Sequence, residues 1–261
     1  MSMRRWAMVG AALALAACSQ GTGNGATAGS ALDQASAAAH KAADQFVAMT
    51  QTGALPPRAT DASAGPLLNT VFNTAALPTT PVSGKELDAV NDWLNSANRV
   101  GIVYVLAGTG VSSLAAANTP AVDQQAGANV VTYAPEMGRY FDAQLAIMGL
   151  EANSLAQSLA TDPGQTSNAQ VAGGLAKMRG GLVGTSSGLL NVLAAPGPTD
   201  DWKEARGKAL VAFAPSAAKL LLPADRASLQ QLATLAVTQT SDPTLKGEFS
   251  QFATLIAPAG S

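Results

Sequence analysis

The sequence predicts an all-α protein, an antiparallel bundle of about seven or eight helices packed through glycine-rich and alanine-rich faces. Hydrophobic residues make up 48% of the 261 residues, and aromatic residues only 5%. Most of the hydrophobic residues are alanine, leucine and valine, a composition that favours close helix packing over a β-sandwich. Apolar residues recur at steps of three and four in several long segments, and proline or glycine separates these segments.

The first predicted helix covers residues 31 to 52. Ser30 and Asp33 have the spacing of a capping box at its start, and Gly53 and a proline pair follow its end. Its apolar face contains Leu32, Ala35, Ala39, Phe46 and Met49. Residues 66 to 72 are expected to form a second, short helix before two further prolines interrupt the chain.

The strongest periodic signal predicts a helix of about 30 residues that starts at Ser83. Ser83 and Glu86 again have capping-box spacing. Nine apolar or small residues then alternate in steps of three and four: Leu87, Val90, Leu94, Ala97, Gly101, Tyr104, Gly108, Val111 and Ala115. A single long helix is the interpretation that accommodates all nine.

The second half of the chain is also predicted to be helical. Two apolar series indicate helices over residues 141 to 159 and 171 to 193, and a proline follows each of them. Three shorter helices are expected after these: residues 202 to 213 capped by Asp200 or Asp201, residues 225 to 237, and a last helix that begins at Asp242 and Pro243.

Glycines recur along the predicted helix at 171 to 193. Gly174, Gly181 and Gly188 are seven apart, and Gly180, Gly184 and Gly188 are four apart. Because glycine destabilises a helix by up to about 1 kcal/mol relative to alanine, such a stripe indicates that another backbone comes close. We expect Gly101 and Gly108 to be the partners in an antiparallel seam. Transmembrane helices carry similar stripes, but charged or polar residues interrupt both segments here.

The N-terminus has the three parts of a cleavable export signal. Arg4 and Arg5 are positively charged, and the uncharged run from Trp6 to Ala17 is too short to span a membrane. The residues Leu15-Ala16-Ala17-Cys18 resemble the lipobox of bacterial lipoproteins. The alternative is an ordinary signal peptide followed by an incidental cysteine.

The lipoprotein resemblance implies that Cys18 is acylated, for example with palmitate, and becomes the mature N-terminus. Ser19 at the next position resembles the pattern of lipoproteins sent to the outer membrane. The resulting organisation is a signal peptide (residues 1–17), a lipidated cysteine with a flexible tether of small residues (18–30), and a helical domain (31–261). The protein would face the periplasm and attach to the membrane through lipid.

The composition excludes several kinds of partner and chemistry. Removal of two arginines with the signal changes the formal charge from −2 to −4, leaving 13 basic and 17 acidic residues. A mildly acidic chain without basic clusters argues against nucleic acid as a partner. Cys18 is the only cysteine, so its acylation leaves no thiol for a disulfide, a metal site or nucleophilic catalysis. We expect no cofactor and no metal.

Two short motifs resemble catalytic or nucleotide sites without their context. Gly108-Thr109-Gly110 follows an apolar run, as in a dinucleotide-binding turn, but that function requires residues 100 to 107 to be a strand. The segment from Gly184 to Gly188 matches G-x-S-x-G, yet a nucleophile elbow needs a preceding strand and a later histidine. His40 is the only histidine and precedes the serine.

Acidic and aromatic residues supply the remaining candidates. Asp88 and Asp92 are spaced as on a solvated helix face. Four charged residues of a later predicted helix could place two acids in a cleft or form surface ion pairs. They are Glu136, Arg139, Asp142 and Glu151. Five aromatic residues could line a ligand site or pack in the core: Trp93, Tyr104, Tyr133, Tyr140 and Trp202.

From these we select Tyr104, Glu136 and Tyr140 as candidate ligand-binding residues between the long helices, and no catalytic residue. The preferred function is non-catalytic binding or scaffolding by a lipid-anchored envelope protein, with a protein partner left unidentified. A helical ligand-binding or enzymatic domain and a dinucleotide-binding α/β domain are the alternatives.

Overall fold

The computed structural model describes residues 30–50, 55–111 and 119–258. Over these residues the chain forms nine α-helices, two short 3-10 helices and no strand, which confirms the all-α class. The α-helices are α1 (Ala31–Thr50), α2 (Gly65–Phe72), α3 (Lys85–Val105), α4 (Pro120–Thr132), α5 (Ala134–Thr161), α6 (Ala169–Ala194), α7 (Asp200–Ala218), α8 (Pro223–Gln239) and α9 (Pro243–Ile256). The 3-10 helices are η1 (Thr74–Ala76) and η3 (Pro163–Ser167).

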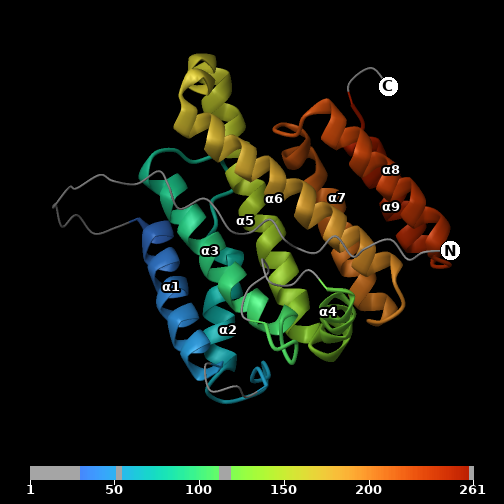
Figure 1. Cartoon of the computed structure of the whole chain (residues 1–261). Helices are drawn as coiled ribbons and strands as arrows, with labels where there is room; N and C mark the ends of the chain where they lie inside the picture. The colour runs from blue at the N-terminus through green and yellow to red at the C-terminus, as the bar shows by residue number, and fades with distance from the viewer. Residues whose placement is uncertain (1–29, 51–54, 112–118, 259–261) are drawn as a thin grey trace.

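Helix α5 is the centre of the bundle (Figure 1). Helix α3 packs against it on one side, with α1 and α2 beyond, and α7 packs against it on another, with α9 and α8 beyond. Helix α6 packs mainly against α8, η3 and α7. The tip where α5 turns into α6 extends past the ends of the other helices in Figure 1. An N-terminal and a C-terminal group of helices therefore share α5.

Several predicted helix ends are confirmed by their caps. At the start of α1, the Ser30 amide donates to Asp33 Oδ2 (2.9 Å) and the Asp33 amide donates to Ser30 Oγ (3.2 Å), the reciprocal pair of a capping box. Asp242 Oδ1 accepts hydrogen bonds from the Thr244 and Leu245 amides and starts α9. Helices α5 and α6 end within two residues of the positions where their apolar series end.

The predicted 30-residue helix is wrong at both ends. Helix α3 starts at Lys85, where Gly84 takes a positive φ of 55° and no side chain caps the helix, so Ser83 and Glu86 form no capping box. It ends at Val105, and Gly108 and Gly110 follow in turns with φ of 70° and 72°. Glycine adopts these angles without a steric penalty, so the chain can turn although the apolar spacing continues. Ala115 lies outside the described residues.

Other departures concern α4 and α7. Helix α4 is not among the predicted helices; it presents few large apolar side chains and starts at the Thr119 cap. The cap of α7 is Thr199, whose hydroxyl accepts from the Trp202 amide, and not Asp200 or Asp201. Helix α7 also continues through Pro215, beside the buried Phe213 and Ala214, although proline in a helix interior usually kinks or ends the helix.

The predicted glycine seam between α3 and α6 is wrong. A Cβ atom placed on Gly101 would lie 2.4 Å from the Tyr140 ring of α5, so an aromatic side chain occupies the space beside this glycine. Gly108 lies in the turn after α3. On α6, Gly174 and Gly180 have open space where a Cβ would lie. None of the described helices is both long enough and apolar enough to cross a membrane.

Candidate functional site

The three predicted ligand-binding residues are all buried, and they belong to two separate arrangements. Tyr104 is in the last turn of α3, Glu136 in the first turn of α5, and Tyr140 one turn further along α5. Tyr104 and Glu136 both contact the segment from Pro57 to Ala59, which precedes α2. Tyr140 instead contacts Asn98 of α3.

A backbone hydrogen bond and a half-exposed arginine hold the buried Glu136 carboxylate. The Ala59 amide donates to Glu136 Oε1 at 2.6 Å, and Arg58 Nη1 lies 3.9 Å from Glu136 Oε2. Arg58 is 44% exposed and Glu136 only 3%, so the arginine joins a buried carboxylate to the solvent. Its guanidinium also stacks 4.3 Å from the centre of the Tyr133 ring and donates to the Thr132 carbonyl.

Tyr104 completes this arrangement from the side of α3. Its hydroxyl donates to the Pro57 carbonyl at 2.8 Å, and its ring packs 5.2 Å from Tyr133 and 5.7 Å from Phe46 between ring centres. Burial, and then the nearby Glu136 carboxylate, raise the pKa of Tyr104 far above its usual value. The phenol is therefore a neutral hydrogen-bond donor. We call Pro57, Arg58 and Ala59 with Tyr104 and Glu136 the 57–59 latch.

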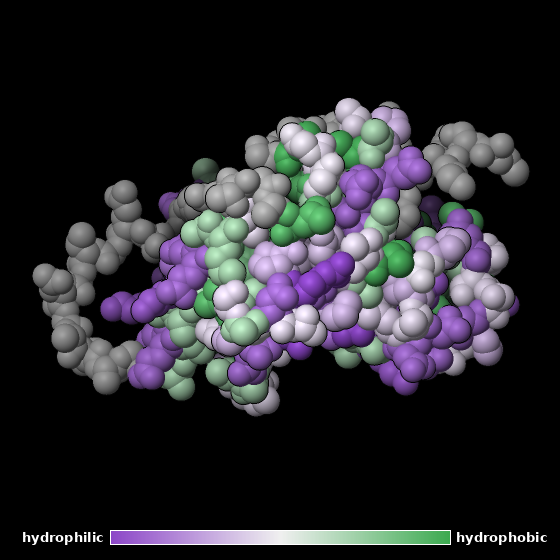
Figure 2. Space-filling view, turned by 90° about the horizontal axis from the view of Figure 1, so that it is seen from below, coloured by the Kyte–Doolittle hydropathy of each residue, from purple (hydrophilic) through white to green (hydrophobic). Residues whose placement is uncertain are grey.

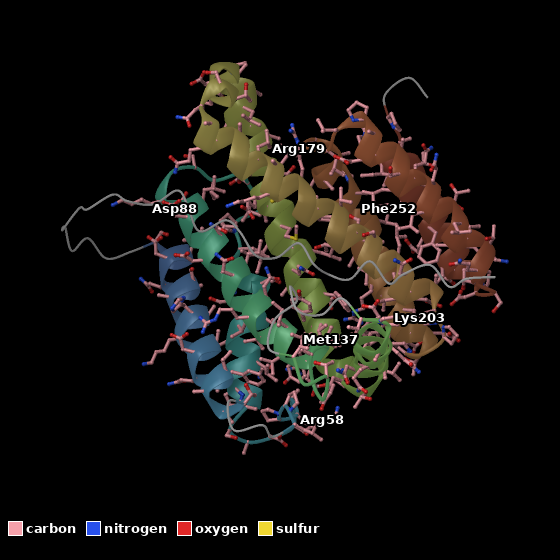
Figure 3. All side chains as sticks on the ribbon, viewed as in Figure 1. Arg58, Asp88, Met137, Arg179, Lys203 and Phe252 are labelled. Atoms are coloured by element: carbon pink, nitrogen blue, oxygen red, sulfur yellow. The ribbon has the colours of Figure 1, made fainter. Side chains whose placement is uncertain are left out.

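The latch lies at one end of the bundle. Figure 3 shows Arg58 at the lower end of the molecule, with Met137 of α5 above it. Figure 2 looks onto this end and shows hydrophilic and hydrophobic residues interspersed on it. Leu55 and Val131, which flank the Arg58 contacts along the chain, are both exposed. The polar groups of the latch are directed at the chain itself and fix the segment before α2 to the junction of α4 and α5.

Tyr140 lies in the contact between α3 and α5. Its hydroxyl donates to Asn98 Oδ1 at 3.2 Å, and Gln144 Nε2 donates to the same oxygen at 3.3 Å. Gly101 leaves the space that the Tyr140 ring fills. Burial raises the pKa of Tyr140 well above its usual value, so this phenol is also neutral.

Glu151, two turns further along α5 than Gln144, is the acid with the most unusual surroundings. Its residue is 3% exposed, and its Oε2 atom has no hydrogen-bond partner among the described residues. Burial raises the pKa of Glu151 to about 7. The Gln144 Oε1 and Glu136 Oε2 atoms also lack a hydrogen-bond partner there, but Glu136 Oε2 has Arg58 Nη1 at 3.9 Å. The sequence placed Glu151 among four charged residues of one helix but gave no sign that it is buried.

The remaining charged candidates form ordinary contacts. Asp142 pairs with Arg206 of α7, and Arg139 donates to Asn69 at 2.7 Å, so the predicted pairing of Arg139 with Glu136 and Asp142 does not form. Asp88 and Asp92 are exposed on α3, as expected of a solvated face. The described residues contain no group of three or more histidine, cysteine, aspartate or glutamate side chains that could hold a metal ion.

The short motifs lack the structure that their chemistry requires. Residues 100 to 105 belong to α3, so the strand of the dinucleotide alternative is a helix. The G-x-S-x-G segment lies inside α6, where Ser186 is fully buried, whereas His40 is exposed on α1. The tryptophans serve packing: Trp93 Nε1 donates to the Val71 carbonyl at 2.8 Å and Trp202 Nε1 to the Ala134 carbonyl at 2.6 Å. Cys18 lies outside the described residues.

Comparisons with protein families, with characterised proteins and with solved structures give no match to this chain. The function is therefore argued from the residues of the chain.

The latch predicts a local effect of Tyr104→Phe. Loss of the hydroxyl removes the hydrogen bond to the Pro57 carbonyl and should destabilise the protein by about 1 kcal/mol. Since Arg58 is the adjacent residue, limited trypsin digestion should cleave after Arg58 faster than in the unmodified protein. Tyr140→Phe is the matched control, because it also removes a buried hydroxyl but leaves the latch intact. Equal cleavage after Arg58 in both variants would contradict the latch.

Proposed function

We propose that this protein is a lipid-anchored protein of the cell envelope with a non-catalytic binding or scaffolding role. The observation that carries the proposal is the segment from Leu15 to Cys18, preceded by two arginines and an apolar run and followed by a tract of small uncharged residues. Acylation of Cys18 would attach the mature chain to a membrane without crossing it. Ser19 favours the periplasmic face of the outer membrane as the destination.

The tether determines how the helical body would sit at the membrane. Residues 19 to 30 are glycine, serine, threonine, alanine, asparagine and glutamine, and a flexible chain of this length spans about 20 Å on average. The capping box of Ser30 and Asp33 then starts α1 directly. The proposal therefore places the start of α1 within about 20 Å of the lipid surface.

The contacts of the candidate residues favour a structural role over catalysis. The Tyr104 hydroxyl, the Tyr140 hydroxyl and the Glu136 Oε1 atom each have a partner within the chain. A catalytic acid or base must instead reach the proton that it transfers on a substrate. These partners support a structural role for the three side chains.

Substitution of Cys18 tests the anchor. In a bacterial host, Cys18→Ala should abolish metabolic labelling with palmitate and release the protein from the membrane fraction. Gln20→Ala is the control, because it changes the tether but keeps the lipobox, and it should label like the unmodified chain. Palmitate labelling that persists in Cys18→Ala would refute the anchor.

A thermal-shift screen with metabolites and lipids separates scaffolding from binding of a small ligand. A ligand present at 100 times its Kd stabilises the folded state by about 2.7 kcal/mol. This stabilisation raises the unfolding temperature measurably. The unfolding temperature of a pure scaffold should stay the same with every compound. A ligand whose shift is lost in Glu136→Gln would instead favour the ligand-binding alternative at the latch.

A further inference from the structure

The contact between α3 and α5 contains two polar positions on α5 that are one heptad apart. The two helices are antiparallel, because Asn98 contacts Gln144, whereas Gly101, later on α3, meets Tyr140, earlier on α5. Gln144 and Glu151 are seven residues apart on α5, so they lie on the same side of that helix. The register that joins Asn98 to Gln144 brings Asn91, seven residues earlier on α3, level with Glu151. We call this contact the α3–α5 seam.

The two ends of the seam differ in how their polar groups are satisfied. At one end, Asn98 Oδ1 accepts from both Tyr140 and Gln144, so neutral hydrogen bonds join the helices, and the unpartnered Gln144 Oε1 belongs to an amide that never ionises. At the other end, Glu151 is as buried as Gln144, but its Oε2 atom has no partner among the described residues. A neutral carboxylic acid is tolerated in such a place, whereas an ionised one requires water or a cation.

No neighbouring cation compensates a charge on Glu151 in the described structure, where burial is the only cause that shifts its titration. On the α7 side, Arg206 pairs with Asp142, and Lys219 donates to Asn153. On α6, Arg179 donates to the Leu220 carbonyl and Lys177 is exposed (Figure 3 labels Arg179). On α3, the charged residues at this end are Lys85, Glu86, Asp88 and Asp92, and all four are exposed. Helices α2, η1 and η3 carry no charged residue within their bounds.

The Glu151 end also has less packing to keep it closed. Beyond Ser154, the residues of α5 are half-buried or exposed up to Thr161. This part of α5 leads into the tip that extends past the other helices in Figure 1. The Asn98 end, in contrast, includes the buried rings of Tyr140, Phe141 and Phe72.

We propose that Glu151 makes the α3–α5 seam a proton-dependent joint. With Glu151 protonated, the seam is closed along its whole length. When the Glu151 carboxyl releases its proton to water, the Glu151 end opens to hydrate the carboxylate, and the N-terminal half of α3 separates from the C-terminal half of α5. The Asn98 end stays closed, because its hydrogen bonds join neutral groups. The inference does not depend on the lipid anchor.

Hydrogen exchange of the full chain tests the joint. We compare amide protection, corrected for intrinsic exchange rates, at about pH 5.5 and about pH 8.5. A carboxyl that titrates near 7 when the seam is closed and near 4.5 when it is open raises the opening equilibrium constant about thirtyfold over this interval. The amides of residues 85 to 94 and 147 to 158 should lose protection by about that factor, and those of residues 97 to 105 should not.

Two variants identify the group responsible. Glu151→Gln keeps the shape but cannot ionise, and should abolish the pH dependence. Glu136→Gln, the matched change at the other buried carboxyl of α5, should preserve it. Equal protection of the unmodified protein at both pH values, or a pH response retained in Glu151→Gln, would overturn the proposal.

A direct titration covers the case in which Glu151→Gln fails to fold. The carboxyl carbon of Glu151 in the unmodified protein should titrate by NMR with a midpoint well above that of an exposed glutamate. A titration midpoint of Glu151 in the ordinary range of exposed glutamates would overturn the proposal of a proton-dependent joint.

Discussion

Gly101→Ala should destabilise the protein by about 2 kcal/mol, although alanine is the better helix former. The new Cβ would lie 2.4 to 2.7 Å from three atoms of the Tyr140 ring, closer than carbon atoms approach without displacement. The Tyr140 ring is fully buried between Phe72 and Phe141, and its hydroxyl is bonded to Asn98, so it has little room to move. The steric cost therefore exceeds the gain in helix propensity of up to about 1 kcal/mol.

Gly180→Ala is the matched control, and we expect the opposite sign. Gly180 lies inside α6, is exposed, and has no atom within 4 Å of the position that a Cβ would take. Alanine there should stabilise the protein by up to about 1 kcal/mol. Urea denaturation of the two variants measures both changes. A neutral or stabilising Gly101→Ala would show that the Tyr140 ring moves freely.

The two glycines show what the sequence can and cannot predict about packing. A glycine in a helix either makes room for a neighbouring group or lies where a larger side chain would also fit. The glycine itself does not show which of the two applies. At Gly101 the predicted neighbour, a glycine of α6, is wrong, because the Tyr140 ring of α5 fills the space beside it. The sequence cannot reveal that the neighbour is the Tyr140 ring rather than another glycine, because that depends on which helices are adjacent.

Helix positions were more predictable than helix ends. Apolar spacing located α1, α5, α6 and α9, because each buries one face. The apolar spacing does not reveal the end of α3, because Gly108 and Val111 continue it while the positive φ angles of Gly108 and Gly110 turn the chain. Helix α4 was missed because a short helix with few large apolar residues gives a weak periodic signal.

The candidate residues were predicted to be close together, and two of the three are. Tyr104 and Glu136 meet because both contact the segment from Pro57 to Ala59. Their partners there are a backbone carbonyl and a backbone amide, which every such residue carries and which leave no pattern in a sequence. Burial of Glu151 is likewise a property of the assembled bundle.

Glu151 should make the whole protein less stable as the pH rises from about 5 to about 8. Burial raises the pKa of Glu151 to about 7 from 4.5, so between these values the folded state holds a proton that the unfolded state has lost. The stability from this proton is fully present below about pH 4.5 and is lost as the pH rises through about 7. Between pH 5 and pH 8 the free energy of unfolding should fall by about 2 to 3 kcal/mol.

The difference between the unmodified protein and Glu151→Gln isolates this contribution. Urea denaturation of both proteins across the pH range cancels the titration of every other group. The variant should be close to the unmodified protein at about pH 5 and more stable at about pH 8, because an amide carries no charge to bury. Glu136→Gln, at a second buried carboxyl of α5, should leave the fall in place, since it keeps Glu151. A difference between the two proteins that stays constant with pH would mean that Glu151 titrates in the folded protein as it does in the unfolded chain.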